Sequence, residues 1–258
     1  MHSALYNVVF YMNPVVCELL EGLLLWRLYH NAAILRYPYL CSFVCYDFLR
    51  TPALLLVAHF WHGTFRSFYW YTDVPAQFLH FLILWEAVRV LFPPDSSLRQ
   101  VGWKALVAAE AIVVPTSIFL CYGQAWLVAL PSKTVPYIFE QYSSLAQALL
   151  LMAIAGVARY YRIPFGRNAR GLIFSLGPYL LIDSLSFASD EVFRTFARHL
   201  ELLPAASFTA MIAVWLWAFW KFAPSPYAAV AHQPDLYWKH QWNSVWETTL
   251  GAARRRSN

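Results

Sequence analysis

The sequence predicts an all-α membrane protein: a polytopic bundle of seven transmembrane helices with the N-terminus outside and the C-terminus in the cytoplasm. Three observations predict this fold. Hydrophobic residues make up 60% of the 258 residues and charged residues only 13%, against roughly 45–50% and about 25% in soluble domains. Apolar stretches long enough to span a bilayer recur along the chain. Lys and Arg collect in alternate loops between these stretches.

Seven stretches approach the roughly 20 mostly apolar residues that a helix needs to cross the hydrocarbon core. We expect the spans at residues 6–28, 38–61, 68–92, 101–123, 134–160, 170–188 and 202–221. The third, fourth and seventh are the clearest, whereas the sixth is short and rich in serine. Five prolines fall well inside spans, where a proline removes a backbone hydrogen bond and tends to kink a membrane helix without ending it. These prolines are Pro14, Pro52, Pro75, Pro115 and Pro178.

The orientation follows from the basic residues, because cytoplasmic loops carry an excess of Lys and Arg. Fourteen fall on one side of the spans and four on the other, and Arg50 lies within a span. The fourteen are Arg27, Arg36, Arg89, Arg99, Lys104, Arg159, Arg162, Arg167, Arg170, Lys221, Lys239, Arg254, Arg255 and Arg256. The four are Arg66, Lys133, Arg194 and Arg198. This bias places the N-terminus outside and the C-terminus in the cytoplasm, and it supports an odd number of spans.

The chain divides into a seven-helix domain, residues 1–221, and a cytoplasmic tail, residues 222–258. Prolines predict an extended linker over residues 222–234. Tryptophans then recur at helical spacing, at Trp238, Trp242 and Trp246, ahead of a basic end. This pattern is typical of an amphipathic helix in the membrane interface. A tail docked on the protein's own loops is the alternative.

Ionisable residues near the predicted cytoplasmic half of the first four spans form an inner group. A charge inside a span is costly, so such residues usually have a partner or a function. Two pairs have the i, i+3 spacing that lets side chains meet on one helix, Asp47 with Arg50 and Glu86 with Arg89. We expect a buried charge network that holds these helices together, with a proton or cation path as the alternative. Its members are Glu18, Glu21, Asp47, Arg50, Glu86, Arg89 and Glu110.

Polar residues in the predicted outer half form stripes on the third, fifth and sixth spans. Because none can face lipid, the three stripes should face one another. We therefore expect a polar cavity open toward the outside that binds a small ligand or cation, with a hydrated packing seam as the alternative. The candidate binding residues are Asp73, Gln77, His80, Glu140, Ser144, Gln147, Tyr179 and Asp183.

Several functional classes are disfavoured. The seventh span has no central lysine for a retinal Schiff base, since Lys221 lies at its end. No Walker loop, H-E-x-x-H or G-x-S-x-G motif is present, so we expect no enzymatic activity. We predict no cofactor and no metal, although a haem between His80 and His59 or His62 is conceivable. The basic loops are explained by topology, so nucleic acid is not an expected partner.

The stretch from Tyr69-Trp70-Tyr71 through Gln77 to Leu84-Trp85-Glu86-Ala87-Val88-Arg89 resembles uncharacterised bacterial seven-helix membrane proteins. In that group an aromatic start of the third helix is followed by an apolar E-x-x-R end. The resemblance is strongest over about residues 68–92. It implies a bacterial inner-membrane protein with seven helices, and it implies no reaction.

Taken together, these features favour a sensory or small-ligand-binding membrane module without its own output domain. A signal would then need a protein partner at the cytoplasmic loops and tail. Two other functions stay open at this point. One is a proton- or cation-coupled carrier that uses the buried carboxylates, and the other is a structural subunit of a membrane complex.

Overall fold

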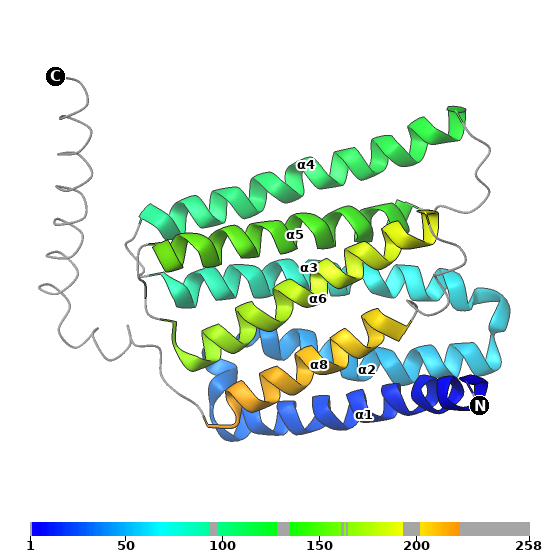
Figure 1. Ribbon diagram of the computed structural model, residues 1–258, viewed down its shortest axis with the longest axis horizontal. Coiled ribbons are helices and arrows are strands. Elements are labelled where there is room, and N and C mark those ends of the chain that lie inside the picture. The colour runs from blue at the N-terminus through cyan, green and yellow to red at the C-terminus, as the bar shows by residue number, and fades with distance from the viewer. Residues whose placement is uncertain are drawn as a thin grey trace, which may run out of the picture. The chain divides into compact units, whose positions relative to one another are not determined.

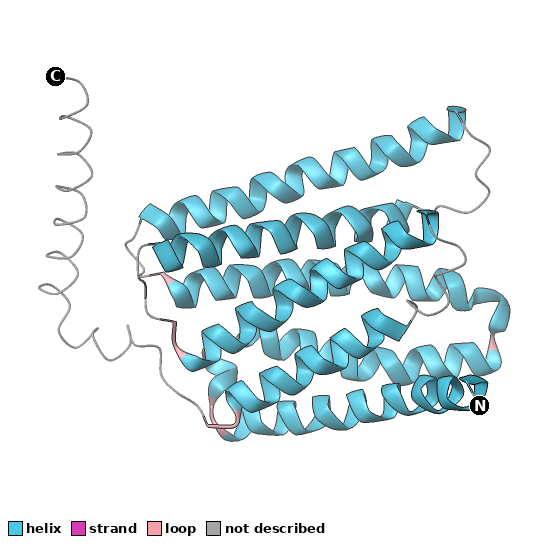
Figure 2. Ribbon diagram, viewed as in Figure 1, coloured by secondary structure: helices cyan, strands magenta, loops and turns pink. Residues whose placement is uncertain are grey.

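The structure is a computed structural model that describes residues 2–92, 97–127, 135–160, 163, 165–192 and 202–221. This part of the chain is all-α and contains no strand (Figure 2). Its α-helices are α1 (His2–His30), α2 (Pro38–Phe60), α3 (Phe65–Leu91), α4 (Ser97–Leu127), α5 (Val135–Tyr160), α6 (Arg167–Val192) and α8 (Leu202–Phe219). Two short 3₁₀ helices, η1 (Ala33–Leu35) and η2 (His62–Thr64), lie in the loops. The predicted tail, residues 222–258, falls outside the described residues.

Each predicted span coincides with one of these seven helices to within a few residues. The sixth, the shortest stretch in the sequence prediction, forms a full helix of 26 residues. All five prolines lie inside helices, as expected. Pro38 opens α2 in its first turn, where the missing N–H costs no intrahelical hydrogen bond.

The helices form a ring that α3 closes, because among the described residues α2 and α4 both pack against α3 and not against each other. Consecutive helices run in opposite directions (Figure 1). Around the ring, α1 packs against α2 and α8, α8 against α6, α6 against α5, and α5 against α4. The α3 helix packs against α2, α4, α5 and α6. Its residues Asp73, Gln77, His80 and Glu86 are buried in the bundle.

The bundle is apolar outside and polar inside. Leu19, Ile112 and Trp217 lie on outward faces of three different helices and are 65–67% exposed. Carboxylates on four helices are buried: Glu21, Asp73, Glu86, Glu140 and Asp183. Water would oppose this arrangement, because soluble proteins rarely expose large apolar surfaces or bury charges. Hydrocarbon around the bundle favours it.

Three helical segments within the described residues are long and apolar enough to cross a membrane. They are Pro38–Phe60, Ser67–Leu91 and Phe139–Tyr160. Leu203–Phe219 in α8 is apolar but shorter. The all-α fold with helices suited to a membrane is therefore confirmed, and the crossing of all seven helices stays a prediction.

The half of the bundle next to the C-terminal end of α1 is filled with apolar side chains. Its core side chains are at most 3% exposed and come from α1, α2, α3, α6 and α8. They include Leu24, Leu28, Leu40, Ile83, Leu84, Leu172, Ile173, Ile212 and Trp215. Asn31 and Arg167 close this end by donating hydrogen bonds to the carbonyls of Phe219 and Trp217, at 3.0 and 2.7 Å. Most of the interior polar residues therefore lie in the opposite half.

Candidate ligand-binding cavity

A cavity of about 540 Å³ lies between α1, α2, α3, α5, α6 and α8. Most of its lining comes from the N-terminal halves of α1, α3, α5 and α8 and the C-terminal halves of α2 and α6. Because neighbouring helices alternate in direction, these segments share the half of the bundle away from the apolar end. The volume falls in the range of about 300–1,000 Å³ that is usual for small-molecule sites.

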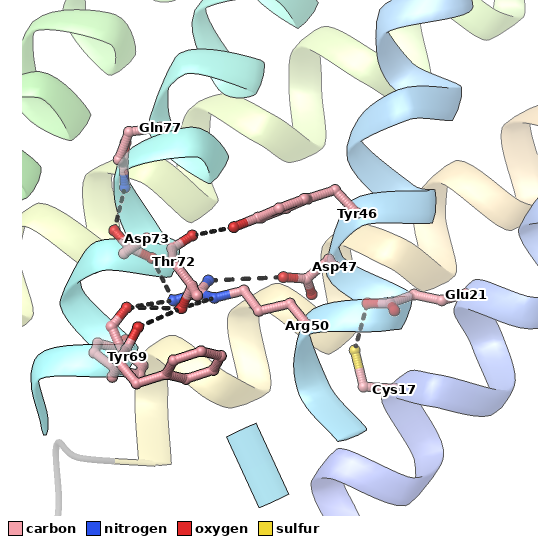
Figure 3. Close-up of polar contacts among 10 residues, drawn as sticks. Cys17, Glu21, Tyr46, Asp47, Arg50, Tyr69, Thr72, Asp73 and Gln77 are labelled. Carbon is pink, nitrogen blue, oxygen red and sulfur yellow. Dashed lines mark hydrogen bonds and ion pairs between the residues drawn. The ribbon is translucent and has the colours of Figure 1, made fainter. Parts of the chain in front are cut away.

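Arg50 is the cation of this cavity and links α2 to α3. Its Nη2 lies 2.8 Å from Asp73 Oδ1, and its Nη1 lies 3.8 Å from Asp47 Oδ1 (Figure 3). The Nε atom donates to Thr72 Oγ1 at 3.2 Å, and the guanidinium carbon lies 5.1 Å from the ring centre of Tyr69. All three charged side chains are largely buried. Arg50 is thus held by carboxylates on two helices and by polar atoms of α3.

This arrangement corrects the division into an inner and an outer group. Asp47 and Arg50 were assigned to the inner group and Asp73 to the outer one, yet all three line the same cavity. Gln147 of the outer group donates to Oε1 of Glu110 of the inner group at 2.9 Å. Depth counted in residues from a helix end fails here, because it ignores helix tilt and the reach of long side chains. The predicted Asp47–Arg50 pair on one helix is present at 3.8 Å.

The three polar stripes do meet, as predicted, although not all of their members reach the cavity. Six of the eight candidate binding residues line it: Asp73, Gln77, His80, Glu140, Tyr179 and Asp183. Ser144 lies behind them and donates to Asp183 Oδ2 at 2.9 Å, which joins α5 to α6. Gln147 instead joins Ser143 and Glu110 in a separate network between α5 and α4.

Polar atoms on the cavity wall lack hydrogen-bond partners among the described residues. They are both ring nitrogens of His80, Oε1 of Gln77 and Oε2 of Glu140. The three side chains are 3–5% exposed. A buried polar atom without a partner costs about 1–3 kcal/mol. Such atoms in a polar cavity mark places where a ligand or ordered water would be held.

Four aromatic side chains from four helices surround one end of the cavity. Phe43 lies 4.5 Å from His80, and His80 lies 5.9 Å from Tyr179. Tyr179 lies 5.3 Å from Phe208, and Phe208 lies 6.3 Å from Phe43, which closes the ring. We call these four residues the aromatic cluster. The sequence pointed to His80 and Tyr179 but not to Phe43 or Phe208, because aromatic residues make up 18% of the chain and carry little positional information.

Two further members of the predicted charge network, Glu86 and Arg89, have structural partners. Glu86 accepts hydrogen bonds from the backbone N–H groups of Tyr39 and Leu40, at 3.3 and 2.9 Å. It therefore caps the start of α2. Arg89 donates to the carbonyl of Arg36 at 3.3 Å, and the ion pairs of the described residues do not include Glu86 with Arg89. The free amides at a helix start attract a carboxylate strongly, which explains why Glu86 points there.

The inner acids of α1 lie beside the cavity rather than in it. Glu21 is buried and accepts a hydrogen bond from the Cys17 thiol at 3.4 Å (Figure 3). Cys17 itself lines the cavity, together with Asn13, and neither was singled out from the sequence. Glu18, the residue that follows Cys17 on α1, is half-buried and keeps one oxygen without a partner in the described part of the chain.

The carboxylates of the cavity are spread around its wall. In the part of the chain that the structure describes, no three His, Cys, Asp or Glu side chains lie close enough together to hold a metal ion. No family model, curated protein or solved structure matches the chain. Its function is therefore argued from the cavity.

Proposed function

We propose that this chain is a multi-pass membrane protein with seven transmembrane helices that binds a small ligand in the cavity, as the receiving part of a sensory module. The observation that carries this proposal is the cavity itself, because His80, Gln77 and Glu140 line it and each has a buried polar atom without a partner among the described residues. A packing seam would have its polar groups paired with one another. Here three wall side chains keep polar atoms without a partner among the described residues, which supports a binding site.

The membrane orientation that goes with this proposal has the N-terminus outside and the cavity in the outer half of a bacterial inner membrane. It is supported by the alternating helix directions, which bring Arg27, Arg36, Arg89, Arg99 and Arg167 to one end of the bundle (Figure 1). Basic ends face the cytoplasm. The bacterial location follows from the resemblance around residues 68–92.

Binding fits the structure better than passage through the bundle. The apolar side chains around Leu84, Leu172 and Trp215 fill the half between the cavity and the basic end. A carrier would need a second arrangement of helices in which that half opens. In a sensory module, the kinked helices would pass movement to the basic loops and to a partner there.

The test is ligand-dependent thermal stabilisation of the purified protein in lipid nanodiscs, screened with a chemically broad library. Compounds that bind in the cavity should stabilise the natural protein and should lose that effect in Glu140→Gln and Asp183→Asn. Glu110→Gln is the matched control, because Glu110 carries the same group but bonds to Ser143 and Gln147 away from the cavity. The proposal fails if no compound stabilises the protein, or if every hit is insensitive to both cavity substitutions.

A further inference from the structure

We propose that the ligand of this cavity is a small organic cation, an amine or ammonium compound with an apolar body. The proposal rests on the proposed function and names the chemical class of its ligand. It draws on three features of the cavity wall: its charge balance, its aromatic cluster and its polar atoms without partners.

The charge balance favours a cation. Among the lining residues are four carboxylates, Asp47, Asp73, Glu140 and Asp183, against one guanidinium, that of Arg50. Arg50 lies beside Asp47 and Asp73. Within the described residues, neither Glu140 nor Asp183 has a Lys or Arg side chain within ion-pair distance. An anionic ligand would add charge of the sign already in excess, whereas a cation would balance it.

Two members of the aromatic cluster lie about one helical turn from two of these carboxylates. Phe43 precedes Asp47 by four residues on α2, and Tyr179 precedes Asp183 by four residues on α6, so each pair shares a helix face. Aromatic faces attract ammonium groups within about 6 Å of the ring centre. They also offer apolar contact area to the rest of a ligand. A carboxylate layer next to an aromatic layer is therefore complementary to a cationic group on an apolar body.

The unpartnered atoms match the same ligand. Oε2 of Glu140 is an acceptor that an ammonium N–H can satisfy, and so is Oε1 of Gln77. The ring nitrogens of His80 can accept or donate a hydrogen bond, and His80 is a member of the aromatic cluster. A bare metal ion is a poorer match, because the described residues bring no three suitable ligands together. The volume of about 540 Å³ also exceeds what an ion needs.

The experiment compares ligands that differ in charge and little else, by titration calorimetry and thermal unfolding in nanodiscs. Phenethylamine is paired with phenethyl alcohol and hydrocinnamate, and choline with its uncharged isostere dimethylbutanol, within a larger panel of amines and their neutral isosteres. We expect a cationic member to bind at least about tenfold more tightly than its neutral isostere. In Asp183→Asn and Glu140→Gln this preference should fall to within about threefold, and Glu110→Gln should retain it.

Phe208→Leu provides a second variant that alters no charge. It should weaken the cation more than the neutral isostere, because only the cation gains from the aromatic face. Unfolding without ligand, read in the same experiment, shows whether each variant is folded. Equal or tighter binding of neutral or anionic members that depends on Asp183 would overturn this inference and leave the proposed function standing. Absence of binding by members of every charge class would count against both.

Discussion

Removal of Arg50 should destabilise the bundle more than removal of either of its carboxylate partners. The substitution is Arg50→Met, which keeps the length and apolar character of the side chain and deletes the charge. It leaves Asp47 and Asp73 facing one another without the cation that separates them. Asp73→Asn, in contrast, leaves Arg50 with Asp47, and Asp47→Asn leaves it with Asp73.

The distances give the order of the effects. With an effective dielectric constant of about 20, charges 2.8 Å apart attract by about 6 kcal/mol, and charges 3.8 Å apart by about 4 kcal/mol. Desolvation offsets much of this, and loss of one partner of a buried pair typically costs about 3–5 kcal/mol. We expect about 5 kcal/mol for Arg50→Met, about 3 kcal/mol for Asp73→Asn, and less for Asp47→Asn.

The measurement is the free energy of unfolding in bicelles or nanodiscs for the single variants and for Arg50→Met with Asp73→Asn. The double variant should be more stable than Arg50→Met alone, because it removes the carboxylate that the single variant leaves unpaired. The expected coupling is at least about 3 kcal/mol, because the two single losses add up to about 8 kcal/mol and the double variant should lose less than about 5 kcal/mol. Additive effects of the two substitutions, or a larger loss for Asp47→Asn than for Arg50→Met, would refute the assignment of Arg50 as the link between α2 and α3.

Three further predictions concern the rest of the bundle. Glu86→Ala should cost about 2 kcal/mol of stability and Glu86→Gln about 1 kcal/mol, because the amide keeps one acceptor for the start of α2; chemical denaturation checks both. Gly171→Ala should cost about 1–3 kcal/mol despite the better helix propensity, since the new Cβ would lie 2.3 Å from Ala218 Cβ. Ala218→Gly in the same chain should recover most of that loss in thermal unfolding. The membrane orientation can be tested with a membrane-impermeant maleimide on intact cells, which should label Gly63→Cys and not Leu35→Cys. Both positions are exposed on the protein, so access depends on the side of the membrane. Labelling of Leu35→Cys and not of Gly63→Cys would mean that the orientation is the opposite one.

The positions of the helices could be predicted from the sequence because they depend on local information. A run of about 20 apolar residues defines a span wherever its neighbours lie. The pairing of polar groups depends on how each helix is rotated and tilted against the next one. Spacing along one helix therefore predicted Asp47 with Arg50, but it could not show that Arg50 also reaches Asp73 on α3.

One signal in the sequence was available for the role of Glu86. The residue before α2 is Tyr37, which offers no side-chain cap, and Pro38 follows in the first turn. Inside a membrane the free N–H groups of such a helix start need a partner from elsewhere in the chain. A carboxylate near the matching end of the antiparallel neighbour was the natural candidate, and Glu86 on α3 is that residue.

Arg50 also gives a way to separate stability from binding. In the absence of ligand it compensates Asp47 and Asp73, and a bound cation would do the same for Glu140 and Asp183. Arg50→Met removes the positive charge that a cationic ligand must approach, so it should raise the affinity for the cation severalfold while it lowers the stability of the ligand-free bundle. Calorimetry with the best-binding amine and with its neutral isostere tests this, since only the charged compound should gain. A loss of affinity for the amine in a variant that is still folded would contradict this reasoning, because it would mean that Arg50 supports the binding of the cation instead of opposing it.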